Sequence, residues 1–208
     1  MNIYEKIEEL KVVPVVVIDD AKDAKDLAKA LCDGGLPCAE VTFRTSAAKE
    51  SIEIMTKEFP DMIVGAGTIL SVEQAKDAIA AGAKFIVSPG FDDAVVDYCI
   101  KENVPVFPGC ITPTEIIRAI NKGLNIVKFF PAEQFGGVST LKALSAPFTG
   151  VKFMPTGGIS LKNINEYLSV KSVIACGGSF MVKKDMIAAG DFASIEKITR
   201  ETLEAVQK

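Results

Sequence analysis

One lysine of the chain lies where a charged side chain is costly. Lys128 falls inside Ile126-Val-Lys-Phe-Phe-Pro131, an apolar run of β-branched and aromatic residues that predicts a buried strand. A buried ammonium group has to be paired or to lose its proton, and a neutral amine can form a Schiff base with a carbonyl substrate. Lys128 is therefore a candidate nucleophile. The alternative is a structural lysine whose stem is buried while its ammonium group reaches water.

A glutamate and an arginine share one face of a second predicted strand. The alternation along residues 39–45 puts Glu40, Thr42 and Arg44 on one face and apolar side chains on the other. A glutamate in the interior is a candidate general base. Arg44, nearer the strand end, is able to hold a carboxylate through two parallel hydrogen bonds. A purely structural Glu–Arg pair is the alternative interpretation.

Glycines mark the ends of three other predicted strands. Val64-Gly-Ala-Gly-Thr68 leaves a threonine hydroxyl that is able to donate to a substrate carboxylate or hydroxyl. Thr156-Gly-Gly158 and Gly177-Gly-Ser179 follow the last two strands. Exposed backbone N–H groups and the Ser179 hydroxyl predict an anion cradle there, most simply for a phosphate group. Each pair taken alone also fits an ordinary turn.

Composition excludes several other chemistries. The sequence has no histidine, which excludes Ser–His and Cys–His nucleophile pairs and any histidine metal site. Five scattered cysteines without C-x-x-C spacing predict reduced thiols rather than disulfides or a zinc site, and we interpret Cys110 and Cys176 as packing residues. With 23 basic and 27 acidic residues, the net charge of -4 argues against nucleic acid as a partner.

No segment predicts a membrane span or a signal peptide. The longest early apolar run, residues 12–18, is too short to cross a bilayer and follows a charged segment. We therefore expect a cytoplasmic protein with no membrane partner.

Eight apolar, strand-like runs alternate with segments that have helical spacing. The expected strands span residues 12–18, 39–43, 63–68, 85–88, 104–107, 126–130, 152–155 and 173–175. No linker or low-complexity stretch divides the chain, so residues 1–208 predict one domain. Strands with continuous apolar character predict a parallel sheet covered on both sides. Eight such units, preceded by an N-terminal helix, predict an α/β fold, a (β/α)8 TIM barrel. An open doubly wound sheet is the alternative.

These residues resemble a known family, the bacterial 2-keto-3-deoxy-6-phosphogluconate (KDPG) and 4-hydroxy-2-oxoglutarate (KHG) aldolases. The motifs that carry the resemblance occur in order along nearly the whole chain: Glu40-Val-Thr-Phe-Arg44-Thr, Val64-Gly-Ala-Gly-Thr68, Ser88-Pro-Gly90, Lys128-Phe-Phe-Pro-Ala-Glu133, Pro155-Thr-Gly-Gly158 and Gly177-Gly-Ser179. The resemblance implies a (β/α)8 class I aldolase that cleaves KDPG to pyruvate and glyceraldehyde 3-phosphate. It also implies KHG, cleaved to pyruvate and glyoxylate, as a second substrate.

The resemblance also implies a role for each residue at the reacting end. Lys128 would form the Schiff base with the C2 ketone, and Glu40 would be the general acid/base. Arg44 and Thr68 would hold the carboxylate of the pyruvate half, with Thr156 beside the reacting atoms.

The other implied residues surround the rest of the substrate. Pro89 and Phe130 would form pocket walls, and Gly157, Gly158 and Ser179 would bind the phosphate. The resemblance implies no metal and no organic cofactor, a phosphorylated keto-acid as the small-molecule partner, and a homotrimer.

Two other functions fit part of the sequence. One is a phosphosugar epimerase on a related barrel, which would commonly need a metal held here by carboxylates or thiols. The other is a barrel that binds a phosphorylated metabolite without cleaving it. The residues leave open which aldehyde fragment, and which configuration at C4, the protein prefers.

Overall fold

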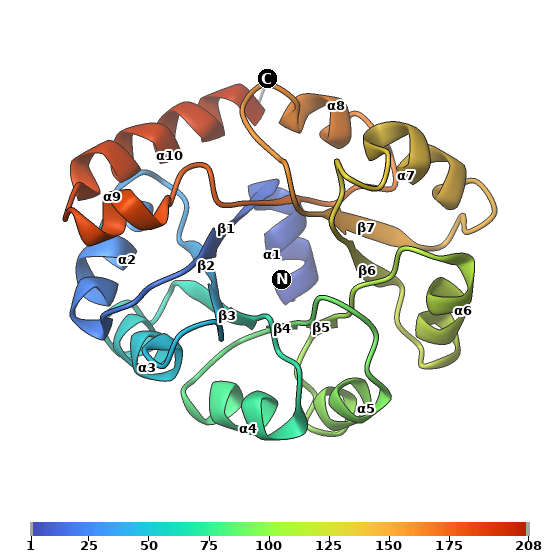
Figure 1. The fold of residues 1–208 in the computed structure, drawn as a ribbon, viewed down its shortest axis with the longest axis horizontal. Helices are drawn as coiled ribbons and strands as arrows, with labels where there is room; N and C mark the ends of the chain where they lie inside the picture. Colours follow the sequence, from blue (N-terminus) through green and yellow to red (C-terminus); the bar gives the residue numbers. More distant parts are fainter. Residues whose placement is uncertain (1, 207–208) are drawn as a thin grey trace.

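The computed structural model describes residues 2–206, in which parallel strands are surrounded by helices (Figure 1). The strands are β1 Val12–Val16, β2 Cys38–Thr42, β3 Ile63–Gly67, β4 Ile86–Val87, β5 Val106–Phe107, β6 Ile126–Phe129, β7 Lys152–Pro155 and β8 Cys176–Gly178. The helices are α1 Ile3–Leu10, η1 Ala21–Asp23, α2 Ala24–Asp33, α3 Ala48–Glu58, α4 Val72–Ala80, α5 Asp93–Lys101, α6 Pro113–Asn121, α7 Gly137–Ser145, α8 Ile164–Leu168, α9 Lys184–Ala188 and α10 Phe192–Val206. The alternation confirms the predicted α/β class.

The strands form two parallel sheets that follow one curled path. Six strands pair in the order β5-β4-β3-β2-β1-β8, and β6 pairs with β7. Isolated parallel bridges join Gly109 to Lys128 and Thr156 to Gly177, at the two junctions between the sheets. The ladder thins at these junctions because β5 is two residues long and proline ends β7, where it has no N–H to donate.

The last strand lies later in the chain than the sequence predicts. Residues 173–175 are the expected strand, and Val173 bridges to Phe153 of β7. The ladder with β1, however, is made by Cys176, Gly177 and Gly178. β-Branched residues favour a strand prediction and glycines oppose it. Here packing favours glycine in the strand, because a Cβ on residue 177 would overlap the Thr156 side chain. Gly177 and Gly178 are therefore strand residues and not the loop that we expected.

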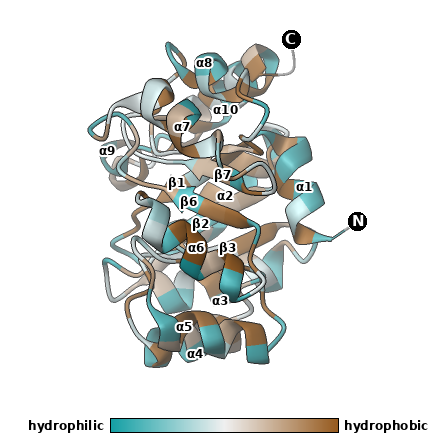
Figure 2. Cartoon of the chain, turned by 90° about the vertical axis from the view of Figure 1, so that its right-hand side faces the viewer, coloured by the Kyte–Doolittle hydropathy of each residue, from teal (hydrophilic) through white to brown (hydrophobic). Residues whose placement is uncertain are grey.

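The expected N-terminal helix, α1, crosses one end of the ring of strands (Figures 1 and 2). It begins at Asn2 with a capping box completed by Glu5. Ile7 is completely buried, and the Tyr4 ring meets Phe107 of β5 edge-on at 5.3 Å between centroids. The helix thus seals apolar surface at the end of the strands where they begin.

Apolar residues concentrate on the strands and on the helix faces turned toward them (Figure 2). Within residues 2–206, none of the helices combines the length and apolar character that crossing a bilayer requires.

The burial of α1 predicts a large stability effect from one side chain. Ile7→Ala should lower the free energy of unfolding by about 2–5 kcal/mol, because it leaves a cavity where the side chain was completely enclosed. Leu70→Ala, which truncates a side chain that is 61% exposed, should change it by less than about 0.5 kcal/mol. Urea denaturation followed by circular dichroism measures both values. Equal effects of the two substitutions would contradict the sealing role of α1.

Candidate active site

Lys128 is buried and paired with the glutamate that the sequence singles out. Lys128 on β6 is 5% exposed, and its Nζ lies 3.3 Å from Oε1 of Glu40 on β2, which is completely buried. The lysine therefore does not extend its ammonium group to water. Its Nζ also lies 5.3 Å from the centroid of the Phe130 ring, within reach of a cation–π contact. Glu40 Oε2 is buried and has no hydrogen-bond partner within residues 2–206.

Strand alternation and a glycine turn Glu40 toward Lys128. In the register of β2, Glu40 pairs with Val15 of β1 and Gly65 of β3, so its side chain leaves the ladder on the inner face. A Cβ on Gly67 would overlap the Glu40 carboxylate. The second glycine of the Gly-Ala-Gly motif thus provides the space that the carboxylate occupies.

Arg44 and Thr68 meet at the ends of neighbouring strands. Arg44 lies just beyond β2, in the turn that follows, and its Nε donates a hydrogen bond of 3.2 Å to Thr68 Oγ1. Thr68 follows β3 with φ 56, a left-handed conformation that is uncommon outside glycine and found at functional sites. Thr42, predicted on the same face as Arg44, instead donates to the carbonyl of Val16. Arg44 lies beyond the ladder, so its bond to Thr68, and not strand pairing, orients its side chain.

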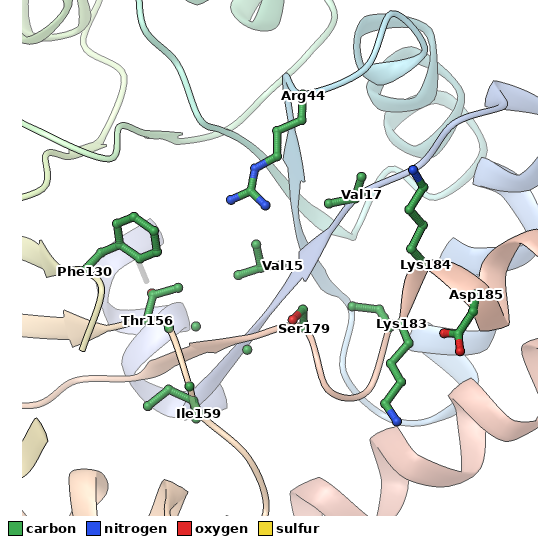
Figure 3. Close-up of a pocket in the computed structure, with 15 residues that line it drawn as sticks. Val15, Val17, Arg44, Phe130, Thr156, Ile159, Ser179, Lys183, Lys184 and Asp185 are labelled. Atoms are coloured by element: carbon green, nitrogen blue, oxygen red, sulfur yellow. The ribbon is translucent and has the colours of Figure 1, made fainter. Parts of the chain in front are cut away.

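A cavity of about 400 Å³ opens at this edge of the sheet (Figure 3). Its lining includes six of the predicted residues, namely Arg44, Phe130, Thr156, Gly157, Gly158 and Ser179. The Thr156 side chain is buried, and its Oγ1 has no partner within the described chain. Phe130 links the cavity to the catalytic candidates, because its ring lies beside Lys128 Nζ.

The loop after β7, residues 156–159, has its carbonyl groups held from outside the cavity. The N–H of Ala132 donates to the carbonyl of Thr156 at 2.8 Å, and the N–H of Glu133 donates to the carbonyl of Gly157 at 3.2 Å. Both donors belong to the turn after β6. The loop is thus bonded to the segment that follows the lysine strand.

The carbonyl of Gly158 is also held from outside the cavity. These bonds to the carbonyl groups decide where the N–H groups of the loop point. Asn163 Nδ2 donates to the carbonyl of Gly158 at 3.0 Å. In a trans peptide the N–H points opposite to the carbonyl of the same unit, so the N–H groups of Gly157, Gly158 and Ile159 turn to the other side of the loop. The N–H of Gly157 takes part in the parallel bridge between Thr156 and Gly177, whereas the N–H groups of Gly158 and Ile159 have no acceptor within residues 2–206. All three residues line the cavity. This is the geometry of an anion-binding nest.

Four of the predicted residues are not among those that line the cavity, namely Glu40, Lys128, Pro89 and Thr68. Pro89, after β4, is half-buried, and its carbonyl occupies the space that a Cβ on Gly109 would need. Thr68 contacts Arg44 instead of facing the cavity directly. Pro89 therefore packs behind the segment that bridges to Lys128, and Thr68 acts first on the arginine.

Sequence reasoning missed charged residues at the cavity rim. Lys183, Lys184 and Asp185 lie in its lining, where α9 begins, and Lys184 Nζ pairs with Asp19 at 2.9 Å. The side chains of the two lysines extend in opposite directions (Figure 3). The signal was present as a double lysine four residues after the Gly-Gly-Ser motif.

The thiols near the site are suited to packing. Burial raises the pKa of the Cys110 thiol to about 12 and also raises the pKa of Cys176. Both thiols therefore stay protonated at neutral pH and are weak nucleophiles. In the part of the chain that the structure describes, no three Cys, Asp or Glu side chains gather as a metal site would require.

The contact between Gly67 and Glu40 predicts a strong local effect. Gly67→Ala should displace the Glu40 carboxylate and lower the free energy of unfolding by about 1–3 kcal/mol, because a methyl group has no space there. Gly150→Ala is the matched control, since a Cβ at Gly150 meets no atom within 4 Å. Thermal unfolding and a crystal structure of each variant measure the two effects. An unmoved carboxylate in Gly67→Ala would contradict this account.

Comparison with known proteins agrees with the geometry. The family model of KDPG and KHG aldolase matches residues 3–198. The 2-dehydro-3-deoxy-phosphogluconate aldolase of Treponema pallidum is 49% identical over 206 residues, which cover 99% of this chain and 98% of that protein. The KHG/KDPG aldolase of Escherichia coli K12 is 43% identical over 196 residues, 94% of this chain and 92% of that protein.

A solved structure shows the same relation. The crystal structure of KDPG aldolase from Legionella pneumophila, with pyruvate captured at low pH as a covalent carbinolamine intermediate, superposes with a TM-score of 0.93 at 38% identity. The match covers 96% of this chain and 97% of that one. The family match over residues 3–198 and the 49% identity place this chain in the KDPG and KHG aldolase family.

Proposed function

We propose that this protein is a class I aldolase that cleaves KDPG to pyruvate and glyceraldehyde 3-phosphate through a Schiff base on Lys128. The observation that carries the proposal is the buried pair of Lys128 and Glu40 beside a cavity whose other wall presents free N–H groups. An amine nucleophile with a proton acceptor at one end and an anion nest at the other suits a phosphorylated keto-acid.

The first step joins the lysine to the substrate ketone. The Nζ of Lys128 attacks C2, and Glu40, whose Oε1 lies 3.3 Å away, accepts the proton that the amine releases. The former carbonyl oxygen takes up protons and leaves as water, so that a protonated imine remains. This imine withdraws electrons from the neighbouring carbons.

The second step breaks the C3–C4 bond. Glu40 removes the proton of the C4 hydroxyl group, which becomes the aldehyde of glyceraldehyde 3-phosphate, while the bond electrons move through C3 and C2 to the imine nitrogen. Oε2 of Glu40 has no hydrogen-bond partner within residues 2–206, so this carboxylate oxygen is available to accept the proton. Protonation of the enamine at C3 and addition of water at C2 then release pyruvate and restore the amine.

The two ends of the cavity suit the two ends of the substrate. Arg44, oriented by its bond to Thr68, is the donor we assign to the carboxylate of the pyruvate half. The N–H groups of Gly158 and Ile159 and the Ser179 hydroxyl are the donors we assign to the phosphate, with Gly157 beside them in the cavity lining. Phe130 forms the wall between them, and Thr156 presents its unpartnered hydroxyl beside the reacting atoms.

We infer that the eight strands close into a (β/α)8 barrel that forms a single domain over residues 1–208. The pairing of β1 with β8 supports this, as do the two bridges that join β6 and β7 to the other strands. Closure brings Glu40, Lys128 and Thr156 to one interior although they come from three strands. Active sites of such barrels lie at the carboxyl ends of the strands.

Three further expectations are extensions of this proposal. KHG is a second substrate, since it has the same keto-acid half, with a C5 carboxylate in place of the phosphorylated fragment. The homotrimer fits the partly exposed apolar side chains Ile100, Ile117 and Ile120 on neighbouring helices α5 and α6. The cytoplasmic location stays a prediction.

Borohydride trapping tests the nucleophile. Reduction in the presence of pyruvate should leave a stable secondary amine on Lys128, found by peptide mass mapping. Lys128→Met should form no adduct and lose at least about a thousandfold in kcat/KM, because no other group replaces the nucleophile. Lys152→Met is the control, since that lysine on β7 bonds to the carbonyl of Lys171 instead. An active wild type with no adduct on Lys128 would refute the proposal.

Substitution of Glu40 separates imine formation from cleavage. Glu40→Gln retains the size of the side chain but is unable to accept a proton, so kcat should fall by about a hundredfold to ten-thousandfold. Trapping of pyruvate on Lys128 should continue, although more slowly. Steady-state pyruvate release and borohydride trapping measure the two steps, and an unchanged kcat would remove Glu40 from the mechanism.

A further inference from the structure

Glu133 is exposed, yet its carboxylate makes a specific contact with a buried side chain. The hydroxyl group of Tyr167, on α8, donates to Glu133 Oε1. Tyr167 is completely buried, and burial together with this bond raises the pKa of its hydroxyl. The hydroxyl therefore stays protonated and remains a donor to the carboxylate.

Glu133 also contacts the loop after β7 through its backbone and its methylene groups. Its N–H holds the carbonyl of Gly157, and its Cβ and Cγ occupy the space next to Gly158 where a side chain would be. Gly157 and Gly158 have φ values of 101 and 75, which glycine adopts readily and other residues rarely do. A two-glycine loop has little conformational restraint of its own, so external contacts decide its shape.

The contacts of Glu133 help to set the direction in which the free N–H groups of the loop point. The Gly157 carbonyl points toward Glu133, and the N–H of Gly158 in the same peptide unit points toward the cavity. A carboxylate held in place by Tyr167 restrains the Glu133 side chain against Gly158. Donors that are already oriented bind an anion without the cost of ordering the loop.

Neither Glu133 nor Tyr167 lines the cavity. Glu133 and Tyr167 therefore influence the substrate only through the loop after β7. Their effect is on the anion-binding nest and not on Lys128.

We propose that Glu133 and Tyr167 are positioning residues that orient the N–H groups of Gly158 and Ile159 for the substrate phosphate, and so set the preference for phosphorylated over unphosphorylated substrates. The inference rests on the proposed function, because it assigns the phosphate to this nest. It makes a prediction that the proposed function alone does not make. Loss of the Tyr167–Glu133 bond should weaken use of KDPG and leave use of KHG, which has no phosphate, unchanged.

The test compares kcat and KM for KDPG and KHG in three variants. Tyr167→Phe removes only the hydroxyl group, Glu133→Ala removes the acceptor, and Glu133→Gln keeps an oxygen that accepts the bond. In the first two, KM for KDPG should rise about threefold to tenfold with kcat nearly unchanged, since one hydrogen bond that orients the loop is lost. Glu133→Gln should stay near the wild-type KM. Tyr98→Phe, on α5 across the ring of strands, is the control for loss of a tyrosine hydroxyl and should change neither substrate (Figure 1).

Two results would overturn the inference. One is an unchanged KM for KDPG in both Tyr167→Phe and Glu133→Ala. The other is an equal loss for KDPG and KHG, which would mean a general structural role. If Tyr167→Phe does not fold, the comparison of Glu133→Ala with Glu133→Gln at this exposed position still decides. Failure of the proposed function is distinct, because the wild type would then release no pyruvate from KDPG and form no borohydride adduct on Lys128.

Discussion

The buried pair of Lys128 and Glu40 is the constraint on which the rest of the structure depends. The two residues are 88 positions apart in the chain, and Nζ and Oε1 lie 3.3 Å apart with almost no exposure to solvent. Removing one partner of such a pair typically costs about 3–5 kcal/mol, because the remaining charge is left without compensation. The curled sheet must therefore bring β2 and β6 to face one interior.

The inner wall of the sheet is built around that pair with residues that lack side chains. Gly67 leaves space for the Glu40 carboxylate, and Gly177 leaves space for Thr156. These glycines weaken their strands as isolated segments. The ladders with neighbouring strands and the enclosing helices compensate for this weaker strand preference. The glycines thereby leave space for the side chains of the site.

Much of the site was predictable from local pattern. A lysine in an apolar strand and a glutamate on the inner face of another both follow from a period of two. The turn residues were less predictable, because alternation ends with the strand. Arg44 lies beyond β2, where its bond to Thr68, and not strand pairing, orients its side chain. The strand predicted at residues 173–175 pairs with β7 at Val173, but its ladder with β1 lies beyond the predicted end, since packing against Thr156 favours glycine in β8.

By itself the sequence determined the chemistry: a nucleophilic amine, a carboxylate, an arginine, two glycine pairs, and no histidine. It determined these because side-chain type and strand alternation are local properties. Only the tertiary structure decided that Glu40 pairs with Lys128, and that the N–H groups of Gly158 and Ile159 turn toward the cavity. Both depend on contacts between segments far apart in the chain, and the orientation of a backbone N–H follows from what holds the carbonyl of the same peptide unit.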